Sequence, residues 1–151
     1  LLQCRGFTSK DFAKSHPQGN LGKRLLKKVS DIMITKKLPV LKKDTLVIKA
    51  IDIITKYNHG IVIIVNSDKK LLGIFTDGDL RRLVDLNVDI NVANISEVMS
   101  SKPKTISPDV LAAEALAKME TSCITTLIVE DNDKNVCGVI HLHDLLRAGV
   151  V

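Results

Sequence analysis

Two short segments of this chain each place a helix-capping side chain three residues before an acid. The first is Thr76-Asp77-Gly78-Asp79 and the second is His141-Leu142-His143-Asp144. The first amides of a helix have no partner within it, and together with the helix dipole they attract phosphate. An ionised carboxylate only accepts hydrogen bonds, so it suits the two hydroxyls of a ribose. The two segments therefore indicate binding of a nucleotide-like ligand.

The same spacing also has a purely structural interpretation. A Thr at the cap followed by an acid three residues later is a variant of the capping box. The acid also meets the positive end of the helix dipole, which is worth about 0.3–1 kcal/mol. The recurrence of the whole pattern in both segments favours a ligand-binding role. Gly73 lies three residues before Thr76, and Gly138 lies three residues before His141.

The recurrence belongs to a longer internal repeat. Gly73–Arg82 is echoed by Gly138–Arg147, and Asp31–Met33 is echoed by Glu97–Met99. Such a repeat predicts two copies of one small unit. A unit of about 55–60 residues buries only about 60% of its unfolded surface and is marginal alone. The two copies are therefore expected to pack together and share a core.

Each copy is predicted to fold as β-α-β-β-α, which gives an α/β (α+β) fold class. The strands are short aliphatic runs, and the helices carry apolar residues at helical spacing. The elements expected in the first copy are strand 39–41, a helix capped by Asp44, strands 61–65 and 71–75, and a helix from Thr76 to about Leu86. Those expected in the second are strand 104–106, a helix opened by Ser107-Pro108-Asp109, strands 125–129 and 136–140, and a last helix opened by His141.

The chain has 151 residues and begins with Leu1, so it is interpreted as a piece of a longer protein. We predict an upstream tail and linker over 1–29, the first copy over 30–86, a linker over 87–95 and the second copy over 96–151. No apolar run reaches the roughly 18 residues of a membrane span. There is no secretory signal pattern, and a cytoplasmic location is expected.

The net charge of +5 is uneven, since 11 of the 22 Lys and Arg residues lie in the first 43 positions. No aromatic residues interleave with these charges and no nucleic-acid reading motif is present, so no nucleic-acid partner is expected. His141 and His143 are expected to diverge at a helix start and lack an obvious third ligand, so no metal is expected.

The repeat resembles a CBS-domain pair, the tandem modules named after cystathionine β-synthase. The resemblance covers residues 30–148 and rests on the family motif Gly-h-h-(Ser/Thr)-x-x-Asp, where h is hydrophobic. The first copy matches it with Gly73, Thr76 and Asp79, whereas the second has His141 where the hydroxyl residue belongs. The resemblance implies two halves related by pseudo-two-fold symmetry, with nucleotides in the clefts between them.

In that family the hydroxyl contacts phosphate and the acid contacts ribose. The implied contacts are thus Thr76 with Asp79 in one copy and His141 with Asp144 in the other, the His141 contact depending on charge because imidazole titrates near neutral pH. The resemblance extends the ligand-binding residues to the neighbours and strand starts, namely Gly78, His143, Gly60, Ile61, Ile124 and Thr125.

The flanks resemble bacterial D-arabinose 5-phosphate isomerases, which join a sugar-isomerase (SIS) domain to a CBS pair. The matching segments are Ser15–Gly22, Ile74–Arg82 and His141–Val151. The resemblance implies a parent enzyme that interconverts D-ribulose 5-phosphate and D-arabinose 5-phosphate for Kdo and lipopolysaccharide synthesis. His16, in Ser-His-Pro-x-Gly, matches the active-site histidine; an enediol route needs a general base. The fragment alone is expected to be inactive.

The leading hypothesis is a regulatory CBS pair that needs no cofactor and binds a nucleotide or nucleotide-sugar effector. CMP-Kdo carries both ribose and phosphate and could act by feedback; an adenine nucleotide is the other candidate. The expected protein partners are its own SIS domain and further copies, as a CBS dimer within a parent tetramer. The alternatives are a ligand-free oligomerisation module and a CBS pair from an unrelated transporter or regulator.

Overall fold

The computed structural model describes residues 26–57 and 59–150. Their contacts divide them into two compact units. The Asp79 unit comprises Lys36–Pro103, without residue 58, and the turn Lys134–Val136. The Asp144 unit comprises residues 26–35, Lys104–Asp133 and residues 137–150. His16 and most of the expected upstream tail lie outside the described residues.

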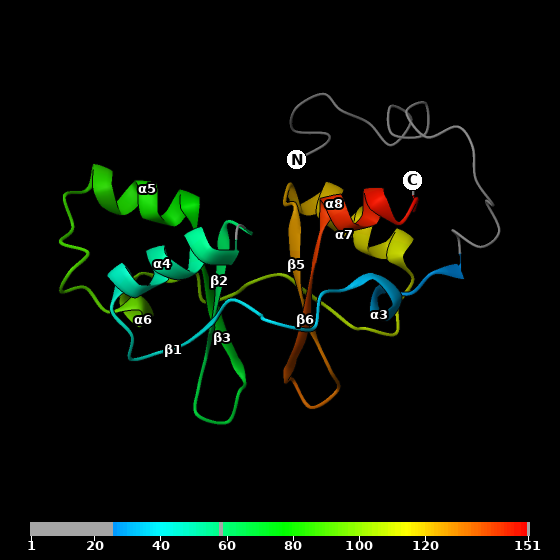
Figure 1. Ribbon diagram of the computed structural model, residues 1–151, viewed down its shortest axis with the longest axis horizontal. Helices are drawn as coiled ribbons and strands as arrows, with labels where there is room; N and C mark the ends of the chain where they lie inside the picture. Colours follow the sequence, from blue (N-terminus) through cyan, green and yellow to red (C-terminus); the bar gives the residue numbers. More distant parts are fainter. Residues whose placement is uncertain (1–25, 58, 151) are drawn as a thin grey trace. The chain divides into compact units, whose positions relative to one another are not determined.

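The Asp79 unit is a three-stranded sheet with helices packed on it. Its elements are β1 (Val40–Lys42), α4 (Val47–Tyr57), β2 (Ile61–Val65), β3 (Leu71–Thr76), α5 (Asp77–Asp85) and α6 (Ile95–Val98). The strand order is β1-β2-β3, with β1 parallel and β3 antiparallel to β2. Figure 1 shows α4 and α5 on the same side of the β2–β3 hairpin.

The Asp144 unit repeats this arrangement. Its elements are α3 (Val29–Ile32), β4 (Thr105–Ile106), α7 (Ala112–Ser122), β5 (Thr126–Glu130), β6 (Val136–His141) and α8 (Leu142–Arg147). The strand order is β4-β5-β6, with β4 parallel to β5. The β-α-β-β-α order predicted for each copy is therefore confirmed.

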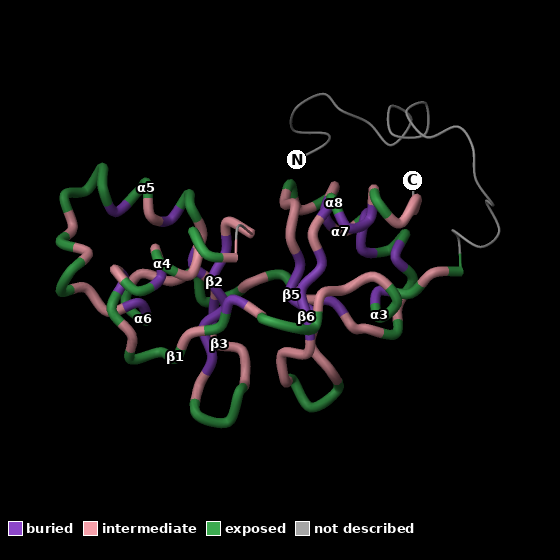
Figure 2. Tube along the Cα trace, in the orientation of Figure 1, coloured by how far each residue is buried: buried purple, intermediate pink, exposed green. Residues whose placement is uncertain are grey.

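Each unit has its own apolar core. All five residues of β2 are buried, as expected of a run of five aliphatic residues that is too short for a helix (Figure 2). The core of the Asp79 unit consists of Val47, Ala50, Val62, Ile64, Phe75, Leu83 and Ile95. The core of the Asp144 unit consists of Val29, Ile106, Ala112, Ala115, Leu116, Met119, Leu127, Val129, Ile140, Leu142 and Leu145.

The short helices α3 and α6 are exchanged between the two units. Helix α3 lies at the start of the first sequence copy but packs in the Asp144 unit, and α6 lies at the start of the second copy but packs in the Asp79 unit. Val29 of α3 is fully buried in the core that the second copy builds. Ile95 of α6 is fully buried in the core that the first copy builds. Backbone pairing continues each exchange, because Ile34 pairs with Val139 and Ser100 pairs with Ile74. Each unit is thus completed by the segment that precedes the other copy.

The exchange explains why two predicted helix starts were wrong. We expected Asp44 and Ser107 to begin helices, but α4 begins at Val47 and α7 at Ala112. The amide of Val47 donates to the carbonyl of Ala93 at 3.0 Å, and that of Ala112 donates to the carbonyl of Lys27 at 2.8 Å. Backbone carbonyls therefore satisfy these orphan amides in place of a capping side chain.

The helices of the described ranges are short. The longest, α4 and α7, have 11 residues each. None of the helices in residues 26–57 and 59–150 has the length and apolar character that would let it cross a membrane.

Candidate ligand-binding site

The corner between β3 and α5 contains a complete capping box. The Thr76 hydroxyl accepts from the amide of Asp79 at 3.2 Å and donates to Asp79 Oδ2 at 3.1 Å. Asp79 Oδ2 also accepts from the amide of Thr76 at 2.9 Å, while Oδ1 pairs with the Arg82 guanidinium. The structural interpretation of this spacing is confirmed. A ligand-binding role for the same residues would be additional to it.

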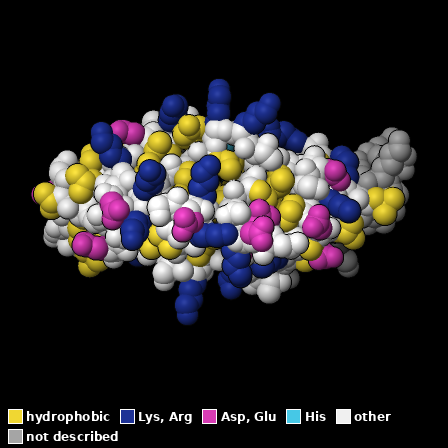
Figure 3. Space-filling view, turned by 90° about the horizontal axis from the view of Figure 1, so that it is seen from below, with side chains coloured by type: hydrophobic (Ala, Val, Ile, Leu, Met, Phe, Trp, Pro, Cys, Tyr) yellow, Lys and Arg dark blue, Asp and Glu magenta, His cyan; other side chains and the backbone are white. Residues whose placement is uncertain are grey.

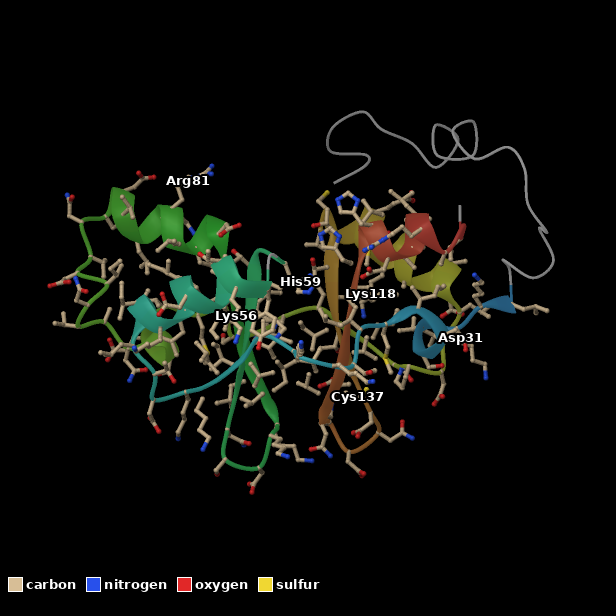
Figure 4. All side chains as sticks on the ribbon, viewed as in Figure 1. Asp31, Lys56, His59, Arg81, Lys118 and Cys137 are labelled. Atoms are coloured by element: carbon tan, nitrogen blue, oxygen red, sulfur yellow. The ribbon has the colours of Figure 1, made fainter. Side chains whose placement is uncertain are left out.

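The start of β2 lies directly beside this corner. The amide of Asp77 donates to the carbonyl of Gly60 at 3.2 Å, and Ile61 pairs with Thr76 in the sheet. His59 precedes this strand start and follows the C-terminal end of α4 (Figure 4). The fold therefore brings the residues that sequence reasoning chose in the first copy to one end of one sheet, namely Thr76, Gly78, Asp79, Gly60 and Ile61.

The corner between β6 and α8 has the same plan with different side chains. The amide of His141 donates to Asp144 Oδ2 at 2.8 Å, and Asp144 Oδ1 accepts from Arg147 Nη2 at 3.0 Å. The amide of Leu142 donates to the carbonyl of Thr125 at 2.8 Å, the counterpart of the Gly60 contact. Thr125 follows Ile124, which packs against the core of this unit.

The two histidines of the second corner do not diverge, so that expectation was wrong. Their rings stack at 4.8 Å between centroids with an interplanar angle of 18°. The amide of His143 donates to His141 Nδ1 at 3.1 Å, and this contact holds the first ring over the start of the helix. Among residues 26–57 and 59–150, no three His, Cys, Asp or Glu side chains form a group that could hold a metal ion.

Asp79 and Asp144 are the polar residues that the described part of the chain buries, with exposed fractions of 6% and 9%. A buried carboxylate is tolerated only when it is hydrogen-bonded or paired. Each of these receives backbone and arginine donors, yet a carboxylate offers about four lone-pair sites. Arg82 and Arg147 have exposed side chains, so their ion pairs add little stability. Both acids therefore retain acceptor capacity for a ligand.

The motif glycines make room for the exchanged segments. A Cβ on Gly73 would lie 2.5 Å from the carbonyl oxygen of Ser100 and 2.8 Å from Met99 Sδ. A Cβ on Gly138 would lie 3.0 Å from the carbonyl oxygen of Ile34 and 2.8 Å from the sulfur of Met33. Close packing thus accounts for the glycine at the head of the motif without any ligand.

Asp144 also borders a cavity that sequence reasoning missed. The cavity has a volume of about 310 Å³ and lies between α3 and α8. Lys27 Nζ donates to the carbonyl of Ala148 at 2.9 Å across it. The lining residues are Lys27, Asp31, Ile32, Asp144, Arg147 and Ala148. The repeat of Asp31–Met33 in Glu97–Met99 was the available signal that this segment has a structural role.

Basic and acidic side chains are mixed on the face of the molecule that Figure 3 shows. Lys, Arg, Asp and Glu side chains lie interspersed there. Arg81 lies on the outer side of α5, away from the sheet (Figure 4). The basic residues visible on that face therefore do not form one continuous patch.

Removing the Thr76 hydroxyl should test the capping box directly. Thr76→Ala is expected to lower the free energy of unfolding by about 1 kcal/mol, because the amide of Asp79 loses its acceptor. For a chain of this size that corresponds to a fall in Tm of roughly 2–4 °C. Thr76→Ser keeps the hydroxyl and should stay near wild type in thermal unfolding. Equal losses in both variants would show that the methyl group, not the cap, matters.

A family model described as "CBS domain" matches residues 29–86 and 95–151. The chain is 46% identical over 152 residues to the arabinose 5-phosphate isomerase KdsD of Yersinia pestis and equally to that of Escherichia coli (strain K12). These alignments cover 100% of this chain and 46% of each relative. The chain thus spans about half the length of the curated relatives it matches.

Solved structures show the same fold. A CBS domain pair of protein MJ0100, in complex with 5′-methylthioadenosine and S-adenosyl-L-methionine, has a TM-score of 0.72 and 26% identity, over 80% of this chain and 94% of that one. An uncharacterized conserved protein from Pyrococcus horikoshii has a TM-score of 0.73 and 24% identity, over 83% of this chain and 93% of that one.

Proposed function

The chain belongs to the CBS domain family, and on that premise we propose that it binds a nucleotide or nucleotide-sugar as a regulatory module. One observation carries the proposal. Each unit holds a buried acid, Asp79 or Asp144, at the start of a helix and next to the start of a strand. In this arrangement the carboxylate can accept hydrogen bonds from the two hydroxyls of a ribose, and neighbouring backbone groups can contact the other parts of a nucleoside.

The chemistry of the Asp79 corner fits a ribose. Gly78 is the second residue of α5, and the first amides of a helix have no partner within the helix. Thr76, Gly60 and Ile61 lie at the same end of the sheet, where Ile61 pairs with Thr76 and the carbonyl of Gly60 accepts from the amide of Asp77. The CBS pair of MJ0100, at 26% identity, was crystallised with two molecules that both contain a ribose. We assign Asp79 as the ribose acceptor, with Gly60 and Ile61 beside the base.

The parent protein is proposed to be an arabinose 5-phosphate isomerase that acts in the cytoplasm. The support is 46% identity over the whole chain to KdsD proteins, together with the Ser-His-Pro-x-Gly segment. In that protein His16 would serve as the general base and a SIS domain would supply the rest of the active site. This identity favours an isomerase over a transporter or a transcription regulator as the source of the module.

The proposed effector is CMP-Kdo, with an adenine nucleotide as the other candidate. CMP-Kdo contains the ribose that the buried acids suit and is an activated end product of the reaction series that D-arabinose 5-phosphate feeds. Binding of such a molecule would couple product level to enzyme activity. Its phosphate would meet helix-start amides.

Asp79→Asn should weaken binding of the effector by roughly 10-fold or more, since a hydrogen bond to a charged group is worth about 1.5–3 kcal/mol. Isothermal titration of wild type and variant with CMP-Kdo, CMP, AMP and ATP measures this directly. Asp68→Asn is the matched control, because Asp68 is exposed in the β2–β3 turn. Equal affinity in wild type and Asp79→Asn would remove Asp79 from the site.

A ligand-free oligomerisation module is the second candidate. It is favoured by exposed apolar side chains at the end of α5 and in the segment between α5 and α6. The exposed fractions of Val84, Leu86 and Val92 are 60%, 72% and 72%. A true ligand at 100 times its Kd would stabilise the chain by about 2.7 kcal/mol. A Tm that does not respond to millimolar CMP-Kdo, CMP, AMP or ATP, with concentration-dependent oligomers in solution, would favour this candidate.

A further inference from the structure

We infer that the cavity between α3 and α8 binds a pentose 5-phosphate, either free or as the ribose phosphate part of a nucleotide, and that Lys27 and Arg147 hold the phosphate. The inference rests on the proposed function in one respect, because it takes Asp144 as an acceptor of sugar hydroxyls. It adds a cavity and two cations that the family motif does not include. All the residues that line the cavity belong to the Asp144 unit.

The size of the cavity favours a small ligand. Its volume of about 310 Å³ is near the lower end of the range of small-molecule sites, which is roughly 300–1,000 Å³. A sugar phosphate fits within such a space, whereas a nucleotide-sugar could place only a part of itself there. The part that matches the lining is the ribose phosphate.

The backbone donors at the start of α8 are already engaged. The amide of Leu142 donates to the carbonyl of Thr125, and the His141 imidazole accepts from the amides of His143 and Asp144. The helix-start amides that meet a phosphate are therefore those of the Asp79 corner. A phosphate beside Asp144 needs donors from side chains.

Lys27 and Arg147 supply these donors. Lys27 Nζ donates to the carbonyl of Ala148 at 2.9 Å, and Arg147 Nη2 donates to Asp144 Oδ1 at 3.0 Å. An ammonium and a guanidinium each carry several donors, so both side chains can bind a phosphate while they keep these contacts. Hydrogen bonds between such cations and a phosphate are charge-assisted and strong.

The acids of the lining indicate that the ligand also carries hydroxyl groups. Asp31 and Asp144 border the same cavity as the two cations. Ionised carboxylates only accept hydrogen bonds, and sugar hydroxyls can donate them. Because the acids offset the cations, the lining suits a ligand with both a phosphate and hydroxyls better than a bare anion.

The residues that open and charge this cavity differ between the two copies. The repeat places Ala93 at the position of Lys27, and the carbonyls of both accept from the first amide of α4 or α7. It places Leu83, which is buried in the core of the Asp79 unit, at the position of Ala148. The small Ala148 and the cationic Lys27 are thus not required by the architecture that the copies share.

Titration of D-arabinose 5-phosphate and AMP into the ¹⁵N-labelled chain tests the site, and the amide resonance of Ala148 reports binding in the cavity. D-Arabinose, adenosine and inorganic phosphate are the comparison probes. We expect a phosphorylated sugar to bind more tightly than the same molecule without its phosphate, and more tightly than inorganic phosphate. Binding of D-arabinose 5-phosphate alone identifies a free sugar phosphate as the ligand, and binding of AMP alone identifies a nucleotide.

Two variants put the residues of the first copy into the cavity. Lys27→Ala should weaken binding of the phosphorylated probe by roughly 10-fold or more, because a hydrogen bond to a charged group is lost. Ala148→Leu should prevent binding because the larger side chain fills the space. Lys28→Ala is the matched control, since Lys28 is exposed and does not line the cavity, and it should keep the wild-type affinity. Thermal melts verify that each variant folds.

Wild-type affinity in both folded cavity variants would overturn the inference. Equal affinity for a sugar with and without its phosphate, or inorganic phosphate that binds as tightly as either sugar phosphate, would also overturn it. The proposed function is judged separately by the loss of nucleotide binding in Asp79→Asn, a substitution in the other unit. If nucleotide binding depends on Asp79 but no probe shifts Ala148, the inference fails alone.

Discussion

Ile95→Ala is expected to destabilise the Asp79 unit by about 3 kcal/mol, because it leaves a cavity in a packed core. Ile95 is fully buried in that core, and its amide donates to the carbonyl of Thr45 at 2.8 Å. The sequence repeat, by contrast, places its segment at the head of the second copy, where Glu97–Met99 answers Asp31–Met33. The variant therefore shows which unit this segment stabilises.

Amide hydrogen exchange measures the effect unit by unit. In Ile95→Ala we expect protection to fall in β2 and β3 and to stay near wild type in β5 and β6. Val29→Ala is the matched control, since Val29 is the fully buried counterpart in the Asp144 unit and should give the reverse pattern. Loss of protection confined to β5 and β6 in Ile95→Ala would contradict the exchange of segments.

Gly73→Ala should lower the free energy of unfolding by about 3 kcal/mol, near the upper end for overpacking. The added Cβ would lie 2.5 Å from the backbone oxygen of Ser100, which also accepts from the amide of Ile74 at 2.9 Å. A backbone atom held in the β-bridge between Ser100 and Ile74 cannot move aside as a side chain can. For a chain of this size the Tm should fall by roughly 6–12 °C in a thermal melt.

Two other glycines supply the comparison. Gly138→Ala should cost less than Gly73→Ala, because its backbone contact is 3.0 Å and the closer atom is the flexible sulfur of Met33. Gly78→Ala should be neutral or stabilising, since its Cβ would meet atoms no closer than 3.6 Å and alanine favours a helix. If Gly73→Ala were as stable as Gly78→Ala, the close approach of the exchanged segment would be wrong.

Local patterns in the sequence were sufficient to predict most elements. The aliphatic run Ile61–Val65 has too few residues for a helix and forms β2. Thr76 and His141 both cap helices as expected, because capping depends on residues within one turn. The repeat of these patterns was enough to predict two related units and to name the acids, Asp79 and Asp144, that the structure buries.

Contacts between distant segments could not be predicted in the same way. Helices α4 and α7 begin at Val47 and Ala112 because remote carbonyls accept from their first amides. The exchange of α3 and α6 between copies leaves no local signal, since either copy offers a similar apolar face. Sequence periodicity indicates which residues are buried, but it does not indicate which distant segment buries them. Tertiary packing determines that partner. It is the reason that Gly73 lies against Ser100 and that Gly60 lies against Asp77.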